Sequence, residues 1–294
     1  MGAKETSEHV IAAHRAAGSF FTAAGVQSFV RSEGDGEPVV LMHGLPASSF
    51  LYRKVIPELA SRSYRAIAFD WPGLGLADRP VDFDYRIPGL GAWAAAAVDA
   101  LGIDRFHLVV HDAGGPVGFE LATHTFERIR SLTILNTMFE LPRNPFPGEI
   151  LGKLSRGGVG KPMRSARAWR EMLERVGVYD TSVLTDEIVL AWRDLALGDN
   201  DGATYLEIMR HVREGHEAGR WQAIVHARTA PYPVQIVWGG HDPMLSLKRY
   251  GWKMLQASGL PAMTIVPGRH FLQEDQAPAV AALIAAHASG VRPG

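Results

Sequence analysis

The sequence of 294 residues contains no cysteine. This absence excludes disulfide bonds, metal sites built from thiolates and a cysteine nucleophile. The sequence also lacks an excess of charge of either sign, because its 30 lysine and arginine residues nearly balance its 31 aspartate and glutamate residues. A protein with this balance is not expected to attract nucleic acid or an anionic membrane surface.

Long apolar runs are missing as well. No uncharged apolar segment approaches the roughly 20 residues that a membrane-spanning helix needs. The first eight residues, MGAKETSE, are polar and lack the apolar core of a signal peptide. We therefore predict a cytoplasmic protein whose partners include neither nucleic acid nor a membrane, and we leave a homodimer open.

The sequence does contain a regular alternation of short apolar segments and helix-like segments. Hydrophobic residues make up 47% and charged residues 21% of the chain, as is ordinary for a globular protein. This alternation is typical of an α/β fold with a mostly parallel sheet and helices on both faces. The predicted strands are 27–31, 38–42, 64–69, 106–111, 132–135, 233–238 and 263–266, and the predicted helices between them are 50–61, 87–101, 117–123 and 277–288.

The alternation stops between residues 139 and 226. A segment rich in proline and glycine, 142–160, is followed by helix-like patterns only, and strands resume at 233. A helical block between two parts of one sheet indicates an insertion. We therefore predict an α/β core formed by residues 1–138 and 227–294, and a helical cap formed by residues 139–226. The helical patterns of the cap are 166–176, 185–197, 205–217 and 221–227.

The stretch 106–119 combines a buried strand, a tight turn and the start of a helix. Asp112 lies at the apex of the turn and is followed by Gly114 and Gly115. This is the shape of the G-x-S-x-G turn that presents a catalytic nucleophile, with aspartate in place of serine. A carboxylate here could instead cap the following helix, where negative charge is favourable. The two glycines also allow a strained turn and close helix packing, which a cap alone does not require.

An acid and a histidine follow two later strands. Asp242 lies in the loop after strand 233–238, and His270 lies in the loop after strand 263–266. Either residue alone would more often be an ordinary loop residue. Together with Asp112 they occur in the order nucleophile, acid, histidine, each beyond the carboxyl end of a strand, where open α/β sheets build their sites. We therefore predict that the three residues form a catalytic triad.

Two glycine-containing turns are further candidates for functional sites. At His43-Gly44-Leu45-Pro46 the turn leaves main-chain amides free, so the amides of Leu45 and Ala113 could form an oxyanion hole, with a simple glycine turn as the alternative. The segment 70–78 contains G-x-G but has Asp78 where a dinucleotide fingerprint needs a third glycine. Histidines and acids show no metal-ligand spacing. We expect neither a cofactor nor a metal.

Taken together, these stretches resemble the α/β-hydrolase superfamily from about residue 27 to the last helix. More narrowly, the chain resembles the branch that contains haloalkane dehalogenases and epoxide hydrolases. The resemblance implies Asp112 as nucleophile, His270 as base, Asp242 as its carboxylate partner, and a helical cap that holds substrate-selecting residues. The segments that carry it are 43–46, 49–53, 70–75, 78–80, 110–115, 135–137, 238–242 and 270–275.

The sequence departs from haloalkane dehalogenases beside the nucleophile. Those enzymes usually carry tryptophan where Ala113 stands, and often asparagine or glutamate where Leu45 stands, so both halide donors expected in the core are absent. In epoxide hydrolases the leaving alkoxide is assisted mainly by tyrosines of the cap. We therefore predict Tyr205, and after it Tyr179, as substrate-binding residues of the cap, and His43 as a further substrate contact.

The residue types also limit the reaction. A carboxylate with a reference pKa of about 3.9 is already ionised at neutral pH. Its attack on a carboxylic ester gives an anhydride, whereas attack on a saturated carbon that bears a leaving group gives a stable alkyl ester. We therefore predict hydrolysis of a small hydrophobic molecule by water through an alkyl-enzyme ester, with an epoxide ahead of an alkyl halide as substrate.

Two observations would separate these hypotheses. A tyrosine hydroxyl that faces Asp112 from the cap would favour epoxides, and an indole N–H of Trp169, Trp192 or Trp221 would favour halides. A third hypothesis is a ligand-binding protein without activity on the same scaffold, which tight binding without turnover would support.

Overall fold

The computed structural model describes residues 3–138, 161–211 and 218–290. The predicted loop 142–160 and the end of the predicted helix 205–217 therefore lie outside the described residues. None of the described helices is long and apolar enough to cross a membrane.

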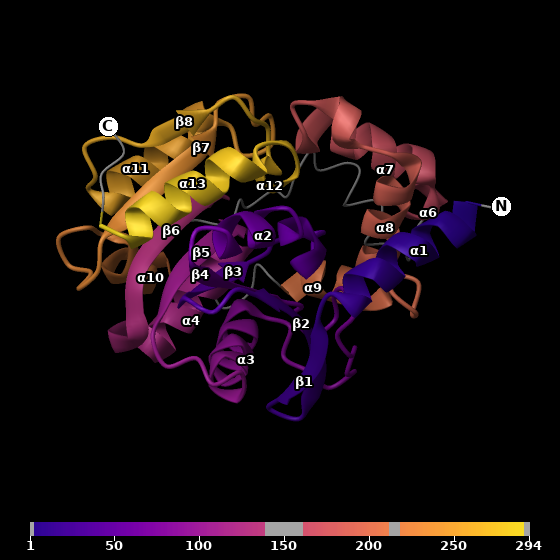
Figure 1. The fold of residues 1–294 in the computed structure, drawn as a ribbon, viewed down its shortest axis with the longest axis horizontal. Helices are drawn as coiled ribbons and strands as arrows, with labels where there is room; N and C mark the ends of the chain where they lie inside the picture. The colour runs from indigo at the N-terminus through magenta and orange to yellow at the C-terminus, as the bar shows by residue number, and fades with distance from the viewer. Residues whose placement is uncertain (1–2, 139–160, 212–217, 291–294) are drawn as a thin grey trace.

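An eight-stranded sheet forms the centre of the molecule, in the order β1-β2-β4-β3-β5-β6-β7-β8 (Figure 1). The strands from β4 to β8 along this order are parallel, and β1 and β2 form an antiparallel edge. The predicted fold class is thereby confirmed. The strands are β1 (Ser19–Ala23), β2 (Val26–Glu33), β3 (Glu37–Met42), β4 (Tyr64–Phe69), β5 (Phe106–Asp112), β6 (Ile129–Thr137), β7 (Val234–Gly239) and β8 (Thr264–Val266).

The apolar runs of the central strands reflect burial on both faces of the sheet. In β3, Val39 and Leu41 belong to one hydrophobic cluster, whereas Val40 and Met42 belong to the other. Successive side chains of a strand point to opposite faces, so a strand buried on both sides must be apolar throughout.

Helices cover both faces. On one face α2 (Val55–Ala60) packs against α13 (Ala277–Ala288), and on the other α3 (Ile87–Ala100) packs against α4 (Gly114–Thr125). The helix predicted at 50–61 is in fact a 3₁₀ turn, η1 (Ser49–Tyr52), followed by α2. Two further helices, α10 (Ala218–Val225) and α11 (Trp252–Ser258), extend the α4 side.

Most of the described part of the predicted cap is helical and lies to one side of the sheet (Figure 1). The helix α10, which also falls within the predicted cap, lies instead against α4 of the core. The longest helix of the cap, α8, begins after Thr185, whose hydroxyl accepts a hydrogen bond from Ile188 N–H, and ends at Gly198 with φ of +62°. Both features are favoured helix ends. The helix α8 spans Asp186–Leu197, and the other elements on this side of the sheet are α6 (Lys161–Arg164), α7 (Ala166–Met172), the π-helical turn η3 (Leu173–Gly177), the 3₁₀ turn η4 (Thr181–Val183) and α9 (Ala203–His211).

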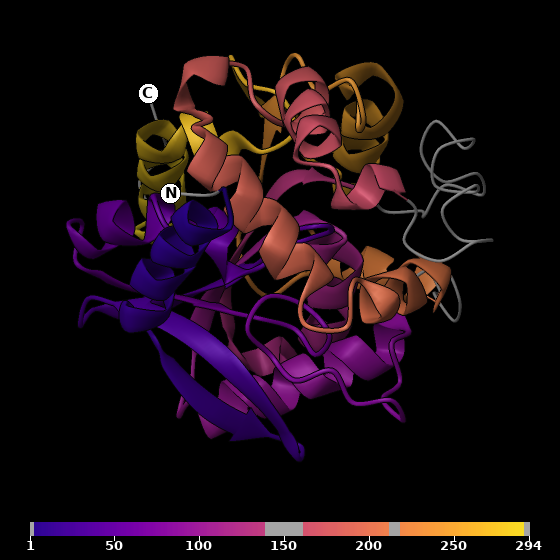
Figure 2. The same ribbon diagram turned by 90° about the vertical axis from the view of Figure 1, so that its right-hand side faces the viewer.

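An N-terminal helix, α1 (Ala3–Ala16), was not predicted from the sequence and packs against α8 (Figure 2). His14 looks like a surface residue in the sequence, because it lies in the polar N-terminal segment, but the structure buries it. Its ring lies between those of Phe29 and Phe50, with centroids 5.0 and 5.2 Å away, and a ring nitrogen lies 3.2 Å from Ser49 Oγ. Burial, followed by the nearby arginine charges, lowers the pKa of His14 to about 3.

This buried histidine predicts sensitivity to acid. Below the ordinary pKa of 6.5 the unfolded chain binds a proton at His14 while the folded protein does not, so stability falls as the pH drops from about 6.5 toward 3. Between pH 7 and 5 the protonation of His14 in the unfolded chain would by itself lower the free energy of unfolding by about 2 kcal/mol. Urea unfolding at both pH values should show a smaller acid-induced loss in His14→Phe than in the parent. Equal losses in the two proteins would contradict the assignment.

Candidate active site

Asp112 ends β5 at the point where the strand order reverses. β3 and β5 are neighbours, but the chain leaves β3 for β4 on one side and returns at β5 on the other. Such a switch point opens a crevice at the carboxyl ends of the strands. Asp112 has φ of +53°, a conformation that costs a non-glycine residue energy and is often found at functional sites.

The glycines around Asp112 let three backbone segments approach it. A side chain at Gly114 would overlap the carbonyl oxygen of His43, and one at Gly115 would overlap Thr137 Oγ1. The hydroxyl of Thr137 in turn donates to the carbonyl oxygen of Asp112 at 2.5 Å. The close packing that the glycines suggested in the sequence is therefore present, and it fixes the strained turn from both sides.

The two carboxylate oxygens of Asp112 have different surroundings. Oδ1 accepts a hydrogen bond from the Leu45 amide at 2.8 Å. Oδ2 is buried without a hydrogen-bond partner among the described residues and lies 3.3 Å from His270 Nε2. The Ala113 amide also donates to this carboxylate and lowers its pKa. Both amides predicted for an oxyanion hole thus donate hydrogen bonds to the carboxylate of Asp112 itself. Oδ2 remains available to react.

His270 is oriented by Asp242. Its Nδ1 lies 2.8 Å from Asp242 Oδ2. The same carboxylate oxygen accepts Asn136 Nδ2 at 2.7 Å, and Oδ1 accepts the amides of Met244 and Leu245 at 2.8 and 2.9 Å. Four donors therefore hold this carboxylate in place, and the imidazole presents Nε2 to Asp112. The structure thus brings all three residues of the predicted triad together.

The charges of the three groups stabilise one another. Burial favours the neutral form of Asp112, but the close approach and charge of His270, with a smaller contribution from the Ala113 amide, hold the pKa below its ordinary value. Burial alone would lower the pKa of His270, whereas the charge of Asp242, the close approach of Asp112 and the hydrogen bond to Asp242 raise it to about 9. At neutral pH the resting site therefore holds two carboxylates and one imidazolium.

His111, the residue before the nucleophile, supports the histidine loop. Its Nε2 donates to the carbonyl oxygen of His270 at 2.8 Å, and the two rings lie 4.8 Å apart. Burial, and then the charge of His270, lower the pKa of His111 to about 4, so it is neutral. Neither Asn136 nor His111 was predicted from the sequence as a residue of the triad or of the oxyanion hole. Each of the two residues lies at the end of a strand, β6 or β5, and this position was the feature of the sequence that could have indicated a role in the site.

His43 has a supporting role in place of the substrate contact that we expected. Its Nδ1 donates to the Gly44 carbonyl oxygen at 3.0 Å, and its Nε2 accepts the Trp71 amide at 3.3 Å. Its ring is buried and stacks on the indole of Trp71 with centroids 4.4 Å apart. Because both nitrogens serve the main chain, His43 fixes the turn that positions the Leu45 amide.

The two cap tyrosines differ in their surroundings. Tyr205, on α9, is buried, and both burial and the charge of Asp112 raise the pKa of its phenol. The phenol therefore lies within electrostatic reach of the nucleophile, and it forms no hydrogen bond within the described part of the chain. Tyr179 is 48% exposed, and its ring packs against that of His241 at 4.7 Å. Of these two tyrosines, Tyr205 is therefore the better candidate for contact with a substrate at Asp112.

The cap tryptophans use their indole N–H groups elsewhere. All three side chains are buried. None of the three N–H groups is available to a leaving group, because each has an acceptor of its own. Nε1 of Trp169 donates to Met163 O at 2.7 Å, that of Trp192 to Glu274 Oε1 at 2.9 Å, and that of Trp221 to Glu120 Oε2 at 3.1 Å.

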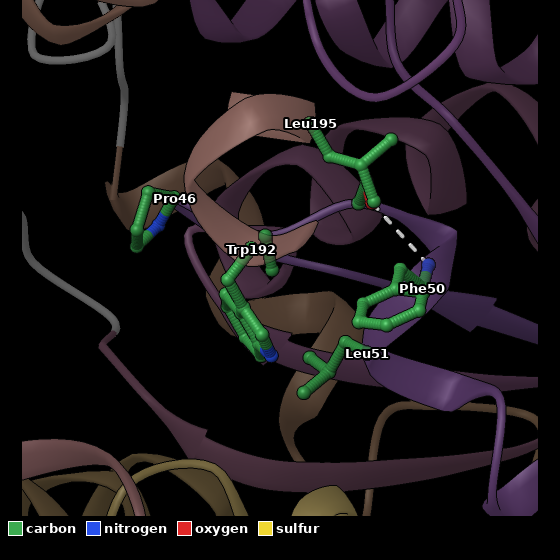
Figure 3. A pocket seen from close by; sticks show the side chains of 7 residues that line it. Pro46, Phe50, Leu51, Trp192 and Leu195 are labelled. Atoms are coloured by element: carbon green, nitrogen blue, oxygen red, sulfur yellow. Dashed lines mark hydrogen bonds between the residues drawn. The ribbon is translucent and has the colours of Figure 1, made fainter. Parts of the chain in front are cut away.

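A small cleft lies where α8 packs on the turn after Leu45 (Figure 3). Trp192 and Leu195 of α8 line one side, and the segment 46–51 lines the other. Asp112, Asp242 and His270 are not among its lining residues. We interpret it as the packing seam between core and cap and not as the substrate pocket.

Comparisons with known proteins agree with this architecture. A family model described as alpha/beta hydrolase fold matches residues 37–156. Haloalkane dehalogenase 2 of Mycobacterium tuberculosis is 29% identical over 259 residues, which cover 86% of this chain and 88% of that protein. Cis-3-alkyl-4-alkyloxetan-2-one decarboxylase of Shewanella oneidensis is 41% identical over 121 residues, which cover 40% of this chain and 38% of that protein.

A solved structure gives the same result for the fold. That of epoxide hydrolase CorEH without ligand superposes with a TM-score of 0.70 and 21% identity, and the match covers 94% of this chain and 99% of that one. At this level of identity the similarity extends to the fold alone.

Proposed function

We propose that this chain, which has the α/β-hydrolase fold, is a hydrolase of the branch of haloalkane dehalogenases and epoxide hydrolases and converts epoxides to diols through an ester of Asp112. The observation that carries the proposal is the set of donors around Asp112. The phenol of Tyr205 is buried and is acted on by the charge of Asp112, while the three cap indoles donate elsewhere.

The first half-reaction forms the ester. Asp112 Oδ2, which has no hydrogen-bond partner in the described structure, attacks a ring carbon of the epoxide from behind the carbon–oxygen bond. That bond breaks, and the ring oxygen takes a proton from the Tyr205 hydroxyl. Esterification removes the negative charge of Asp112, which helps to keep the pKa of His270 near 9. His270 then loses its proton to the tyrosinate and becomes a neutral base.

The second half-reaction hydrolyses the ester. Neutral His270 takes a proton from a water molecule whose oxygen attacks the ester carbonyl carbon of Asp112. The negative charge that develops on Oδ1 is stabilised by the amides of Leu45 and Ala113, the former already 2.8 Å away. On collapse the bond between the carbonyl carbon and the original Oδ2 breaks, and Oδ2 leaves as an alkoxide that takes the remaining proton of the attacking water. The diol is thereby released, Asp112 is again a carboxylate that holds the oxygen of water, and His270 is again an imidazolium. Asp242 stabilises the imidazolium throughout.

Haloalkane dehalogenation is the second candidate, because the Mycobacterium tuberculosis relative bears that name. Parallel assays of diol formation from epoxides and halide release from haloalkanes separate the two candidates. An oxetan-2-one belongs in the same panel, since it also offers a saturated carbon that bears an oxygen leaving group. Diol formation without halide release is the expected result. Halide release with no diol would overturn the assignment, and binding without turnover across the panel would favour a non-enzymatic ligand-binding protein.

Tyr205→Phe tests the proposed proton donor. Loss of one hydrogen-bond donor to a developing oxyanion typically costs about 10²- to 10³-fold in rate. We expect a decrease of that order in the rate of ester formation from an epoxide, measured in a single turnover, and little change in ester hydrolysis. Tyr179→Phe is the matched control and should leave both rates unchanged. Equal rates in Tyr205→Phe and the parent would remove Tyr205 from the mechanism.

A further inference from the structure

The loop that carries His270 is fastened to the cap by main-chain hydrogen bonds. The amide of His270 donates to Val176 O at 3.2 Å, and the amide of Phe271 donates to Gly177 O at 2.8 Å. Val176 and Gly177 end the π-helical turn η3, a kind of turn that is frequent at functional sites. Because one of the donors is the peptide group of the proposed base itself, movement of this turn would move the imidazole.

Side chains reinforce the contact on both sides of His270. Asp275 Oδ2 accepts the amides of Tyr179 and Asp180 at 2.6 and 2.8 Å. The guanidinium of Arg269 donates to the carbonyl oxygen of Glu174. The histidine loop is therefore bound to a continuous stretch of the cap, residues 174–180, which we name the cap clamp.

The fit at Gly177 is close. A Cβ atom at this position would lie 2.8 Å from the ring of Phe271. The centroid of that ring lies 4.8 Å from that of the His270 imidazole and 4.7 Å from that of a Trp192 ring. A side chain at Gly177 would therefore push Phe271 and, through it, the imidazole.

The core holds the same loop independently of the cap. Asp242 binds Nδ1 of His270, and His111 donates to its carbonyl oxygen. The Leu45 amide that holds Asp112 Oδ1 belongs to the core as well. Within the described residues, the hydrogen bonds that position the nucleophile come from core elements, whereas those that position the base come from core and cap together.

We propose that the cap clamp is a positioning element for His270 that controls ester hydrolysis more than ester formation. This inference rests on the proposed two-step mechanism. In the second step Nε2 must take a proton from a water molecule aligned with the ester carbonyl, and small displacements of a catalytic group cost up to about 100-fold in rate. In the first step Asp112 needs only its own orientation, which the clamp does not set.

Gly177→Ala tests the proposal in rapid-quench experiments with intact-protein mass spectrometry. We expect ester hydrolysis to slow by about tenfold or more, while the rate of ester formation changes less than about threefold, so that the alkyl-enzyme accumulates during turnover. Unchanged hydrolysis, or an equal decrease in both steps, would overturn the proposal. Asp275→Ala, which removes the acceptor for Tyr179 and Asp180, should slow the same step and serves if Gly177→Ala does not fold.

Thr185→Ala is the control for general weakening of the cap. It removes the hydroxyl that caps α8 without touching the histidine loop, and we expect a lower melting temperature with the ratio of the two rates unchanged. A selective loss of hydrolysis in this control would also overturn the proposal.

A readout without substrate keeps this inference separate from the proposed function. The proton between His270 Nδ1 and Asp242 should give a downfield NMR signal that shifts or broadens in Gly177→Ala and Asp275→Ala but not in Thr185→Ala. If the parent protein forms no ester, the two-step mechanism fails and this signal still decides whether the clamp positions His270. An unchanged signal in both variants would contradict the clamp.

Discussion

His270→Gln is expected to stop turnover after the first half-reaction. Asp112 keeps its contact with the Leu45 amide in this variant, so ester formation continues, but no base is left to activate water. Loss of a triad histidine typically lowers turnover by about 10⁴-fold or more. Intact-protein mass spectrometry after addition of an epoxide should show the protein heavier by the mass of one substrate molecule. The parent enzyme should show little of this species in the steady state.

His270→Gln separates the covalent mechanism from one in which His270 activates water for direct attack on the substrate. In direct attack the variant would be inactive without gaining mass. His111→Gln is a useful comparison, because it changes a neighbouring histidine that is neutral and does not contact Asp112 Oδ2. It should retain turnover at a reduced rate and accumulate less ester than His270→Gln.

Asp112→Asn is expected to abolish the first half-reaction. A carboxamide has the size of the carboxylate but carries no negative charge and is a poor nucleophile, so we expect turnover to fall by about 10⁴-fold or more. The measurement is product formation under saturating substrate together with the absence of any mass increase. Asp199→Asn, at a side chain that is 88% exposed, is the matched control and should be fully active. Residual activity above about one hundredth of the parent would contradict a nucleophilic role.

Asp112→Asn also changes the charge balance of the site. The charge of Asp112 and its approach to His270 Nε2 at 3.3 Å are among the causes that raise the pKa of His270 to about 9. Without them the pKa of His270 should be lower in the variant than in the parent. An NMR titration of the imidazole measures this difference directly, and an unchanged pKa would show that the two groups do not interact.

The buried strands and the order of the candidate triad could be predicted because they leave strong local signals. Continuous apolar runs such as 38–42 and 64–69 occur where a strand is covered on both faces, and the observed strands β3 and β4 follow them closely. Asp112 was recognisable because a charged residue ends such a run and glycines follow it. Polar residues at the carboxyl ends of parallel strands meet at one edge of the sheet, which brought Asp242 and His270 into consideration.

The missed features depend on contacts between distant parts of the chain. α1 has a polar sequence, and His14 is buried only because Phe29 and Phe50 enclose it. β1 is half exposed and lacks the apolar run of a central strand. Hydrophobic periodicity cannot identify such elements, because their burial is decided by partners far away in the sequence.

The cap donors could not be ranked from the sequence for the same reason. Helical periodicity shows that Trp192 lies on a buried face, but not that its indole N–H meets Glu274, 82 residues away. It also does not show that the phenol of Tyr205 lies near Asp112, whereas Tyr179 lies at the surface. The choice between epoxide and halide chemistry therefore depends on tertiary structure.

The most direct test of the covalent mechanism is a single turnover in ¹⁸O-labelled water with enzyme in excess over epoxide. After digestion, mass spectrometry of the peptide that contains Asp112 should show one ¹⁸O atom in its carboxylate, because water attacks the ester carbonyl and the original Oδ2 leaves with the diol. The diol from this first turnover should contain no ¹⁸O. Label in the diol with an unlabelled Asp112 would mean that water attacks the substrate directly, and would contradict the covalent mechanism.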